Sequence, residues 1–232
     1  MTAAVFASER LLFTPLTPNA DAIKTIFAFP NEYSVGITSL GYQVVWATLS
    51  SRPDLQVSRL FTDCHEPLPQ QTELLGYSLS WELDYVNILN LLEFLEIPVR
   101  AAQRTDTHPL VFGGGPVLTA NPEPFAAFFD VILLGDGENL LGNFIDAYKQ
   151  VRTAERIVQL RHLAQVPGVY IPSLYEVSYQ ELTGKIQTIQ PIDAQIPAVI
   201  AKQTYRGNTL SDRKSTRLNS SHPSISRMPS SA

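Results

Sequence analysis

The chain has 232 residues, of which 44% are hydrophobic and 17% charged, a composition typical of a soluble globular protein. Its net charge of −5 argues against a broad nucleic-acid-binding surface, which would need a basic stripe. No apolar run approaches the roughly 18 residues of a membrane span, and we expect no signal peptide and a cytoplasmic location. The single cysteine, Cys64, excludes an internal disulfide and a metal site built on several cysteines of this chain.

The first half of the chain predicts alternating strands and helices. We expect strands over 23–29, 55–61 and 73–80, and helices over 35–49 and 84–96, the latter followed by an extended segment at 97–99. In both helices the apolar residues recur at intervals of three and four, which is the spacing of one helix face. The first helix should stop at Ser51-Arg52-Pro53.

The second half continues this alternation and then departs from it. We expect strands over 110–112 and 131–134, helices over 139–151 and 154–164, and a hairpin of 175–179 with 185–189 around Thr183-Gly184. Strand–helix alternation is typical of right-handed βαβ units. The sequence therefore predicts an α/β fold, a doubly wound parallel sheet of about five strands over 23–153, with an N-terminal extension (1–22) and a small C-terminal β appendage (154–210).

Two glycine turns are the most informative features. Gly113-Gly114-Gly115-Pro116 follows the apolar run 110–112, and Gly135-Asp136-Gly137-Glu138 follows 131–134. In open α/β sheets ligands bind in the crevice beyond the carboxyl ends of the strands, and bare glycine backbone permits a close approach. We therefore expect a nucleotide- or cofactor-sized crevice here; structural turns without a ligand are the alternative.

The acidic residues of the second turn have two interpretations. Asp136 and Glu138 can hydrogen-bond a ribose hydroxyl, or they can cap the helix that begins near Asn139. Capping is the favoured role of Glu138, because an acid near a helix N-terminus is favourable.

The turn over 31–36, which contains Glu32 and Gly36, joins the first strand to the first helix. Phosphate-binding loops commonly lie at such a turn. Neither GxGxxG nor GxxxxGK[ST] is present, so a plain turn is favoured over a phosphate loop.

The end of the third strand carries hydroxyls, acids and aromatic residues in the segment 78–85 (SLSWELDY). Ser78 and Ser80 lie where a ligand would bind, although Ser80 also suits a helix cap. Trp81 and Tyr85 either line the pocket of a flat ligand or fill the core beneath the helix.

Asp63-Cys64-His65 is similar to the Asp-x-His-x-x-Gly loop that supplies a cobalt ligand in some cobalamin proteins, but Leu68 stands where glycine should be. A surface histidine is therefore the favoured interpretation. The remaining histidines have no partners at ligand spacing, and no Gly-x-Ser-x-Gly elbow is present. We predict no catalytic and no metal-ligating residue.

Four segments together resemble a family of radical S-adenosylmethionine proteins. They are 33–43 (YSVGITSLGYQ), 78–85, 113–116 with 121–124 (NPEP), and 135–138, in the family's order. The resemblance covers about 23–210 and implies a cobalamin-binding-like Rossmann domain at the N-terminus of the family. It also implies cobalamin as the cofactor of the crevice, held by Glu32, Gly36, Ser78, Ser80 and the two glycine turns.

The family's chemistry lies in a following domain, where a CxxxCxxC loop ligates a [4Fe–4S] cluster that cleaves S-adenosylmethionine. With Cys64 alone this chain cannot assemble the cluster. We therefore expect a truncated cofactor-binding module, inactive by itself, whose partner is its own radical SAM domain in the full-length protein, reached through a linker at 202–207. The alternative is a non-catalytic interaction or substrate-recruiting domain that keeps the fold without cobalamin.

The segment 211–232 differs in kind, because eight of its 22 residues are serine and few are apolar. Such a segment cannot bury enough surface to offset its ordering entropy, which predicts a disordered tail. Residues 212–221 also resemble a translated sequencing adapter, and this artefact is the favoured interpretation, with the natural chain cut near Leu210.

Overall fold

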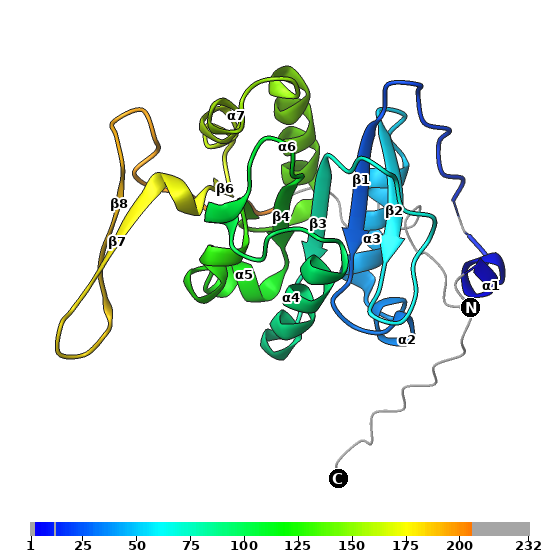
Figure 1. Cartoon of the computed structure of the whole chain (residues 1–232), viewed down its shortest axis with the longest axis horizontal. Coiled ribbons are helices and arrows are strands. Elements are labelled where there is room, and N and C mark those ends of the chain that lie inside the picture. Colours follow the sequence, from blue (N-terminus) through cyan, green and yellow to red (C-terminus); the bar gives the residue numbers. More distant parts are fainter. Residues whose placement is uncertain (1–2, 12, 206–232) are drawn as a thin grey trace, which may run out of the picture.

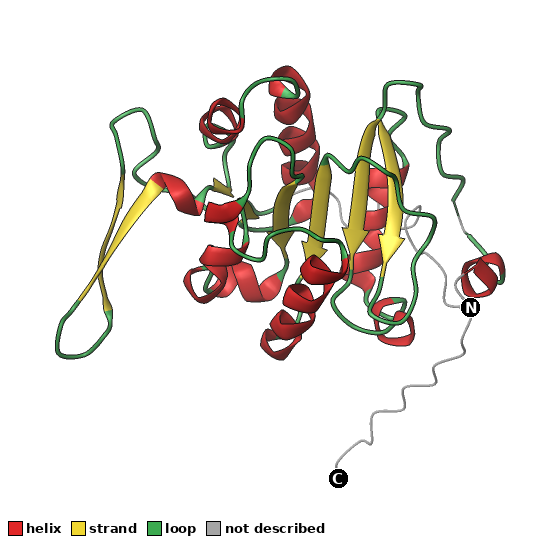
Figure 2. Cartoon of the chain, in the orientation of Figure 1, coloured by secondary structure: helices red, strands yellow, loops and turns green. Residues whose placement is uncertain are grey.

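The computed structural model describes residues 3–11 and 13–205, so the predicted tail lies outside the described residues. Most of the chain forms a central sheet covered by helices, with a two-stranded hairpin beside it (Figures 1 and 2). The strands are β1 (Ile23–Ala28), β2 (Leu55–Leu60), β3 (Leu74–Ser78), β4 (Leu110–Gly114), β5 (Val131–Leu133), β6 (Val169–Tyr170), β7 (Tyr175–Tyr179) and β8 (Ile186–Pro191). The α-helices are α1 (Ala3–Ala7), α2 (Tyr33–Gly36), α3 (Leu40–Ser50), α4 (Tyr85–Phe94), α5 (Pro116–Ala120), α6 (Gly137–Val151) and α7 (Arg156–Leu163). Short 3₁₀ helices are η1 (Glu82–Asp84), η2 (Ala101–Gln103), η3 (Glu123–Phe128) and η4 (Pro172–Leu174).

The main sheet has the strand order β2-β1-β3-β4-β5-β6. The first five strands are parallel, and β6 pairs antiparallel with β5 through Ile132 and Tyr170. The predicted α/β parallel sheet is thus confirmed, with a sixth, antiparallel strand that was not predicted. Its two residues are too few to show a period, and they form a strand only because β5 offers a free edge.

The two faces of the sheet bury different side chains of the same strands. In β4, Leu110 and Phe112 pack with α3, α6 and α7, whereas Val111 packs with α4 and α5. This alternation follows from the period of two in a strand. Both faces are apolar because helices cover both, as in a doubly wound sheet.

The single helix expected over 35–49 is wrong: the structure has α2 and α3 with a break between them. Ser39 adopts an extended backbone and its hydroxyl accepts a hydrogen bond from the Tyr42 N–H at 3.4 Å. A serine that caps a new helix has overridden the continuous apolar spacing. The extended segment expected at 97–99 is not a strand of the sheet.

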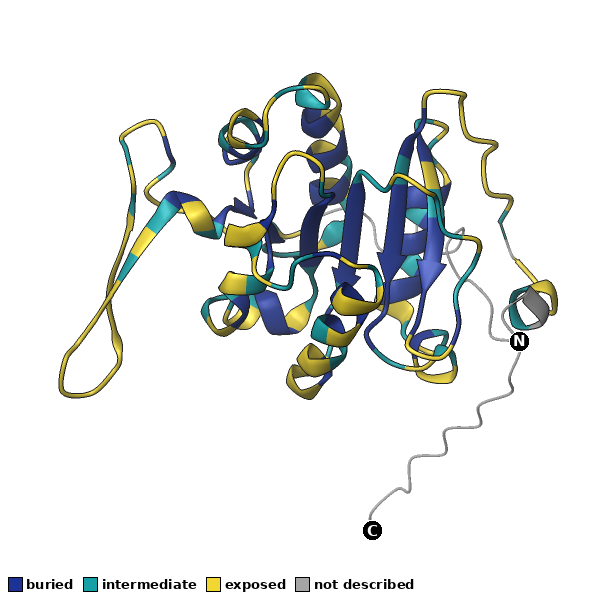
Figure 3. Cartoon of the chain, viewed as in Figure 1, coloured by how far each residue is buried: buried dark blue, intermediate teal, exposed yellow. Residues whose placement is uncertain are grey.

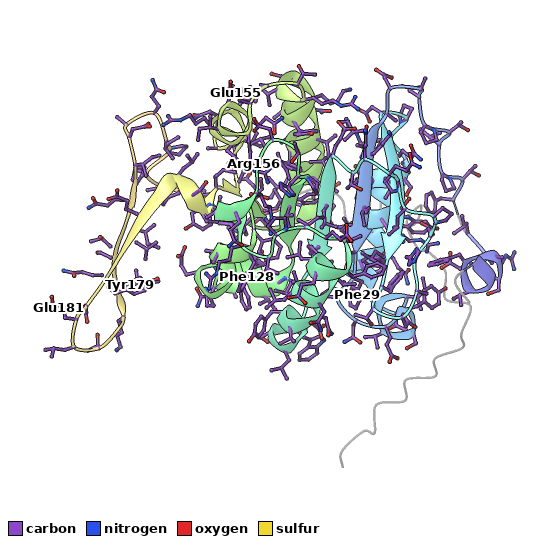
Figure 4. All side chains as sticks on the ribbon, in the orientation of Figure 1. Phe29, Phe128, Glu155, Arg156, Tyr179 and Glu181 are labelled. Carbon is purple, nitrogen blue, oxygen red and sulfur yellow. The ribbon has the colours of Figure 1, made fainter. Side chains whose placement is uncertain are left out.

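The predicted hairpin is confirmed as β7 and β8, paired antiparallel from Tyr175↔Pro191 to Tyr179↔Ile186. It projects from the body, and most of its residues are exposed (Figure 3). Figure 4 shows Tyr179 and Glu181 on this projecting part. Tyr179 is 56% exposed and Leu182 fully exposed, so the tip carries apolar surface without a covering element among the described residues.

The N-terminal extension is attached to the sheet through a buried ion pair. Arg59 at the end of β2 donates two hydrogen bonds to Glu9, at 2.8 and 2.7 Å, and one from its Nη2 to Glu66 at 2.8 Å. Its guanidinium carbon also lies 4.0 Å from the centroid of the Trp46 ring.

Within the described residues, no helix is both long and apolar enough to cross a membrane.

Candidate functional site

A cavity of about 620 Å³ opens at the carboxyl ends of the parallel strands. It lies between α3, α6 and the ends of β1, β3, β4 and β5, where most of its lining is apolar. Its size falls within the range of small-molecule sites. Its lining consists of Phe27, Leu40, Gly41, Val44, Val45, Thr48, Tyr77, Ser78, Ser80, Phe112, Gly114, Gly115, Pro116, Thr119, Leu133, Gly135, Asp136, Gly137, Glu138, Leu141 and Lys202.

The sheet topology explains why this space is open. The chain passes from β1 through α3 to β2 at one edge and then returns to β3 on the other side of β1, so the strand order reverses there. The helices that follow β3 and β4 cover the opposite face. From these two connections, Ser80, Pro116 and Thr119 line the space between α3 and α6. A crevice at such a reversal is the general ligand position of open α/β sheets.

The structure places eight of the eleven predicted binding residues at this cavity. They are Ser78, Ser80, Gly114, Gly115, Gly135, Asp136, Gly137 and Glu138. Gly113, Glu32 and Gly36 are outside its lining. Proximity alone does not give these residues a binding role, which stays a prediction.

Glu32 and Gly36 belong to the α2 region. Glu32 is exposed, and its N–H is hydrogen-bonded to the Asn31 side chain at 2.8 Å. Gly36 is buried, and a Cβ added there would lie 2.5 Å from the Phe61 ring. Gly36 is therefore explained by packing of the core rather than by a ligand.

Packing also explains two of the three glycines in the first turn. A Cβ on Gly113 would lie 2.5 Å from the Phe129 ring, and one on Gly115 would lie 2.4 Å from the Leu79 carbonyl oxygen. Gly115 additionally has φ +117°, a conformation that residues with a side chain rarely adopt. Leu79 itself is held by its N–H bond to the Gly114 carbonyl at 2.9 Å.

The second turn contacts a later part of the chain. Gln203 forms a parallel bridge with Gly135: its N–H donates to the Leu134 carbonyl and its own carbonyl accepts from the Asp136 N–H, both at 2.9 Å. The Tyr205 N–H then donates to Asp136 Oδ2 at 2.9 Å. A Cβ on Gly135, where φ is +123°, would lie 2.0 Å from the Gln203 carbonyl oxygen. Gly135 and Asp136 thus hold the chain's own segment.

Three cavity glycines have no such explanation. A Cβ on Gly114 would meet nothing closer than 3.8 Å, one on Gly137 nothing closer than 3.5 Å, and one on Gly41 nothing within 4 Å. Gly41 is the second residue of α3 and Gly137 the first residue of α6, and both line the cavity. These three positions leave backbone bare around an apolar space.

Gly41 and Lys202 are lining residues that sequence reasoning missed as site residues. Gly41 lies in a predicted helix, and only the topology shows that this helix borders the crevice. Lys202 comes 67 residues after Gly135 and reaches the cavity because its neighbour Gln203 pairs with that turn. A glycine inside the helix predicted over 35–49 is a local signal that could have found Gly41.

Beyond the cavity, polar side chains join the loop after β1 to the start of α4. The Asn31 amide donates to Asp84 Oδ1 at 3.0 Å, and the Asn87 amide donates to the Pro30 carbonyl at 2.9 Å. Asp84 is buried, which raises the pKa of its carboxyl. These groups support the strand ends.

Trp81 is 68% exposed beside Ser80 and does not fill the core.

Cys64 and His65 do not form a metal centre. Cys64 is buried, and burial raises the pKa of its thiol to about 11, which keeps it protonated near neutral pH. His65 Nδ1 lies 2.8 Å from the Glu66 carbonyl oxygen. Over the described ranges, 3–11 and 13–205, no group of three or more His, Cys, Asp and Glu side chains could hold a metal ion.

Comparison with known proteins finds a family model that matches the middle part of this chain. Residues 60–172 match the family model described as radical SAM proteins, N-terminal. This region runs from the end of β2 through β6 and includes both glycine turns. It is therefore similar to the N-terminal region of radical SAM proteins.

Two individual proteins are also similar. An uncharacterized protein of Methanocaldococcus jannaschii is 27% identical over 110 residues, which are 47% of this chain and 23% of that protein. The radical S-adenosylmethionine methyltransferase TsrM from Kitasatospora setae, solved with tryptophan substrate and the SAM analogue aza-SAM, superimposes with a TM-score of 0.42 at 16% identity. That superposition covers 69% of this chain and 29% of TsrM. Each match thus spans less than a third of the relative's length.

Proposed function

We propose that this chain is a cofactor-binding module of a radical SAM protein, with cobalamin as the ligand of the cavity. The observation that carries the proposal is the bare backbone of Gly41, Gly114 and Gly137 around an apolar space at the strand-order reversal. Packing within the protein does not require glycine at these positions. A ligand that approaches the backbone closely does.

The residues present fit cobalamin in character. Its heteroaromatic base and sugar–phosphate arm match a cavity with apolar walls from Val44, Phe112 and Leu141 and hydroxyls from Ser78 and Ser80. Cobalamin is larger than about 620 Å³, so part of it must lie at the mouth. Leu40 lines the cavity and is 58% exposed, and Trp81 follows the lining residue Ser80 and is 68% exposed. Both offer an apolar surface for the corrin.

Cobalamin supplies a cobalt centre able to carry a methyl group. The protein's own part is to bind and orient the ligand: bare glycine backbone lets it approach α3, β4 and α6, and the apolar walls exclude water from the part that enters. The described residues offer no metal-binding group of three or more His, Cys, Asp and Glu side chains. A single cobalt ligand would not form such a group, but no histidine is among the cavity-lining residues, so the proposal takes no cobalt ligand from the lining.

We further propose that radical chemistry resides in a separate domain of the complete gene product. A CxxxCxxC loop needs three cysteines and the sequence has one. Sequencing the source locus across the codons for Thr209 to Lys214 tests this. A reading frame that continues into a CxxxCxxC loop supports it, and a genuine stop after the serine-rich residues contradicts it.

A spectral titration tests the ligand. Hydroxocobalamin added to the full chain should show a saturable shift of its visible bands at micromolar protein. Gly137→Ala is the matched variant, because its Cβ has room in the free protein and would enter the space that the ligand is proposed to occupy. No band shift in the wild-type protein at high concentration would overturn the proposal.

The second candidate is an interaction domain that keeps the fold without cobalamin. The exposed hairpin favours it, because an isolated two-stranded hairpin is at best marginally stable in water and this one exposes Tyr179, Leu182 and Ile186. A folded chain that binds no cobalamin, and whose hairpin amides become protected from exchange when a radical SAM domain is added, would support this candidate.

A further inference from the structure

The segment 201–205 borders the cavity that we propose as the cobalamin site. Lys202 is part of the cavity lining, and its neighbour Gln203 is bridged to Gly135 in a turn that also lines the cavity. The cavity is therefore completed by a piece of chain that comes after the hairpin, far from the sheet in sequence.

Backbone hydrogen bonds hold this segment in place. Gln203 exchanges two bonds with Leu134 and Asp136, and the Tyr205 N–H reaches the Asp136 carboxylate, all at 2.9 Å. Upstream, Ile196 is buried and the Tyr175 hydroxyl donates to the Pro197 carbonyl at 2.7 Å. The contacts at 196–197 thus involve other residues than those at 203–205, and they hold the chain upstream of the docked segment.

The turn is shaped for this segment. A side chain on Gly135 would collide with the Gln203 carbonyl, and a Cβ on Gly168 would lie 2.5 Å from Gln203 Cγ. Asp136 contributes both its N–H and its carboxylate to the segment. The same turn continues into Gly137, whose bare backbone faces the cavity.

We infer that docking of residues 201–205 and occupancy of the cavity are coupled, with Gln203 as the positioning residue. The inference rests on the proposed function and deepens it. A ligand that contacts both the 135–138 turn and Lys202 binds the docked form better and so stabilises it. By reciprocity, loss of docking weakens ligand binding by the same factor.

Gln203→Pro is the variant that separates this coupling from direct contact. Proline has no N–H to donate to the Leu134 carbonyl, and Gln203 is not among the cavity-lining residues. Gln203→Ala is the matched control, because it removes the side chain and keeps the backbone donor. Hydroxocobalamin titrations of the full chain should give at least a tenfold weaker affinity for Gln203→Pro and an affinity within twofold of wild type for Gln203→Ala.

A second measurement does not depend on how the variants fold. In the wild-type protein, hydroxocobalamin should slow hydrogen exchange at the amides of Asp136, Gln203 and Tyr205 by at least tenfold. Equal affinities of the three proteins, or unchanged exchange at these amides on saturation, would overturn the coupling alone. No binding by the wild-type protein would overturn the proposed function and the coupling with it.

Discussion

The two glycine turns have similar sequences and lie on neighbouring strands, yet they meet different partners. The first turn is packed against the interior: Gly113 against Phe129, and Gly115 against the Leu79 carbonyl. In the second turn, Gly135 lies against the carbonyl of Gln203, which is near the end of the described chain. The first turn therefore contacts the core, and the second turn contacts a later segment of the chain.

The difference shows that glycine after a buried strand has at least two physical causes. Core packing accounts for Gly113 and Gly115, and docking of the chain's own segment accounts for Gly135. Only Gly114 and Gly137 keep open space on the cavity side. Substitution by alanine separates the causes, because each predicts a cost of different size.

Gly115→Ala should have the largest effect on stability. The new Cβ would lie 2.4 Å from a backbone carbonyl that cannot move away, and φ +117° adds strain for any residue with a side chain. We expect a loss of about 3–5 kcal/mol in the free energy of unfolding, measured by urea titration. Gly114→Ala is the control and should lose no more than about 0.5 kcal/mol. Equal losses in both variants would contradict the assignment.

Gly135→Ala should lower the free energy of unfolding by less than Gly115→Ala does, by about 2–3 kcal/mol. This holds although its Cβ would lie closer to a carbonyl oxygen than the Cβ of Gly115→Ala would. The Gln203 carbonyl can leave with its segment, so only the strain at φ +123° and the lost docking remain. A double-mutant cycle with Gln203→Pro measures the docking part. The cost of Gly135→Ala should fall in the Gln203→Pro background, and a cost that is unchanged would show that the segment is not its cause.

Gly113→Ala should destabilise by about 1–3 kcal/mol, the range of an overpacked core. Its Cβ would meet the Phe129 ring edge and Leu118 Cδ1, which are side-chain atoms able to shift. In urea titrations, the loss in the free energy of unfolding of this variant should lie between the losses of Gly115→Ala and Gly114→Ala. A neutral result would mean that the core beside the first turn is looser than the structure shows.

Gly137→Ala should change the free energy of unfolding by no more than about 0.5 kcal/mol, because its Cβ has room beside Val45 and Gly137 is the first residue of α6. The hydroxocobalamin affinity should nevertheless fall about tenfold. Binding thus weakens while stability is unchanged. A variant that binds as tightly as wild type would remove Gly137 from the proposed site.

Local patterns predicted much of the fold for identifiable reasons. Strands such as 110–112 are short apolar runs that end at glycine, and the hairpin alternates with a period of two, so both appear without tertiary information. The break between α2 and α3 was missed because a capping serine within an apolar pattern is a weak signal. The sixth strand was missed because its pairing partner, not its composition, makes it a strand.

The amino-acid sequence was enough to predict the parallel α/β sheet, the edge at which its glycine turns lie, and the resemblance of those turns to radical SAM proteins. These features depend on short-range spacing, which is a local property of the chain. The folded chain was needed to see which glycines are packed, that Gly135 contacts Gln203, and which glycines border the cavity together with Lys202. Such assignments depend on which distant segments come within a few ångströms of one another, and strand order and crossover side set that proximity.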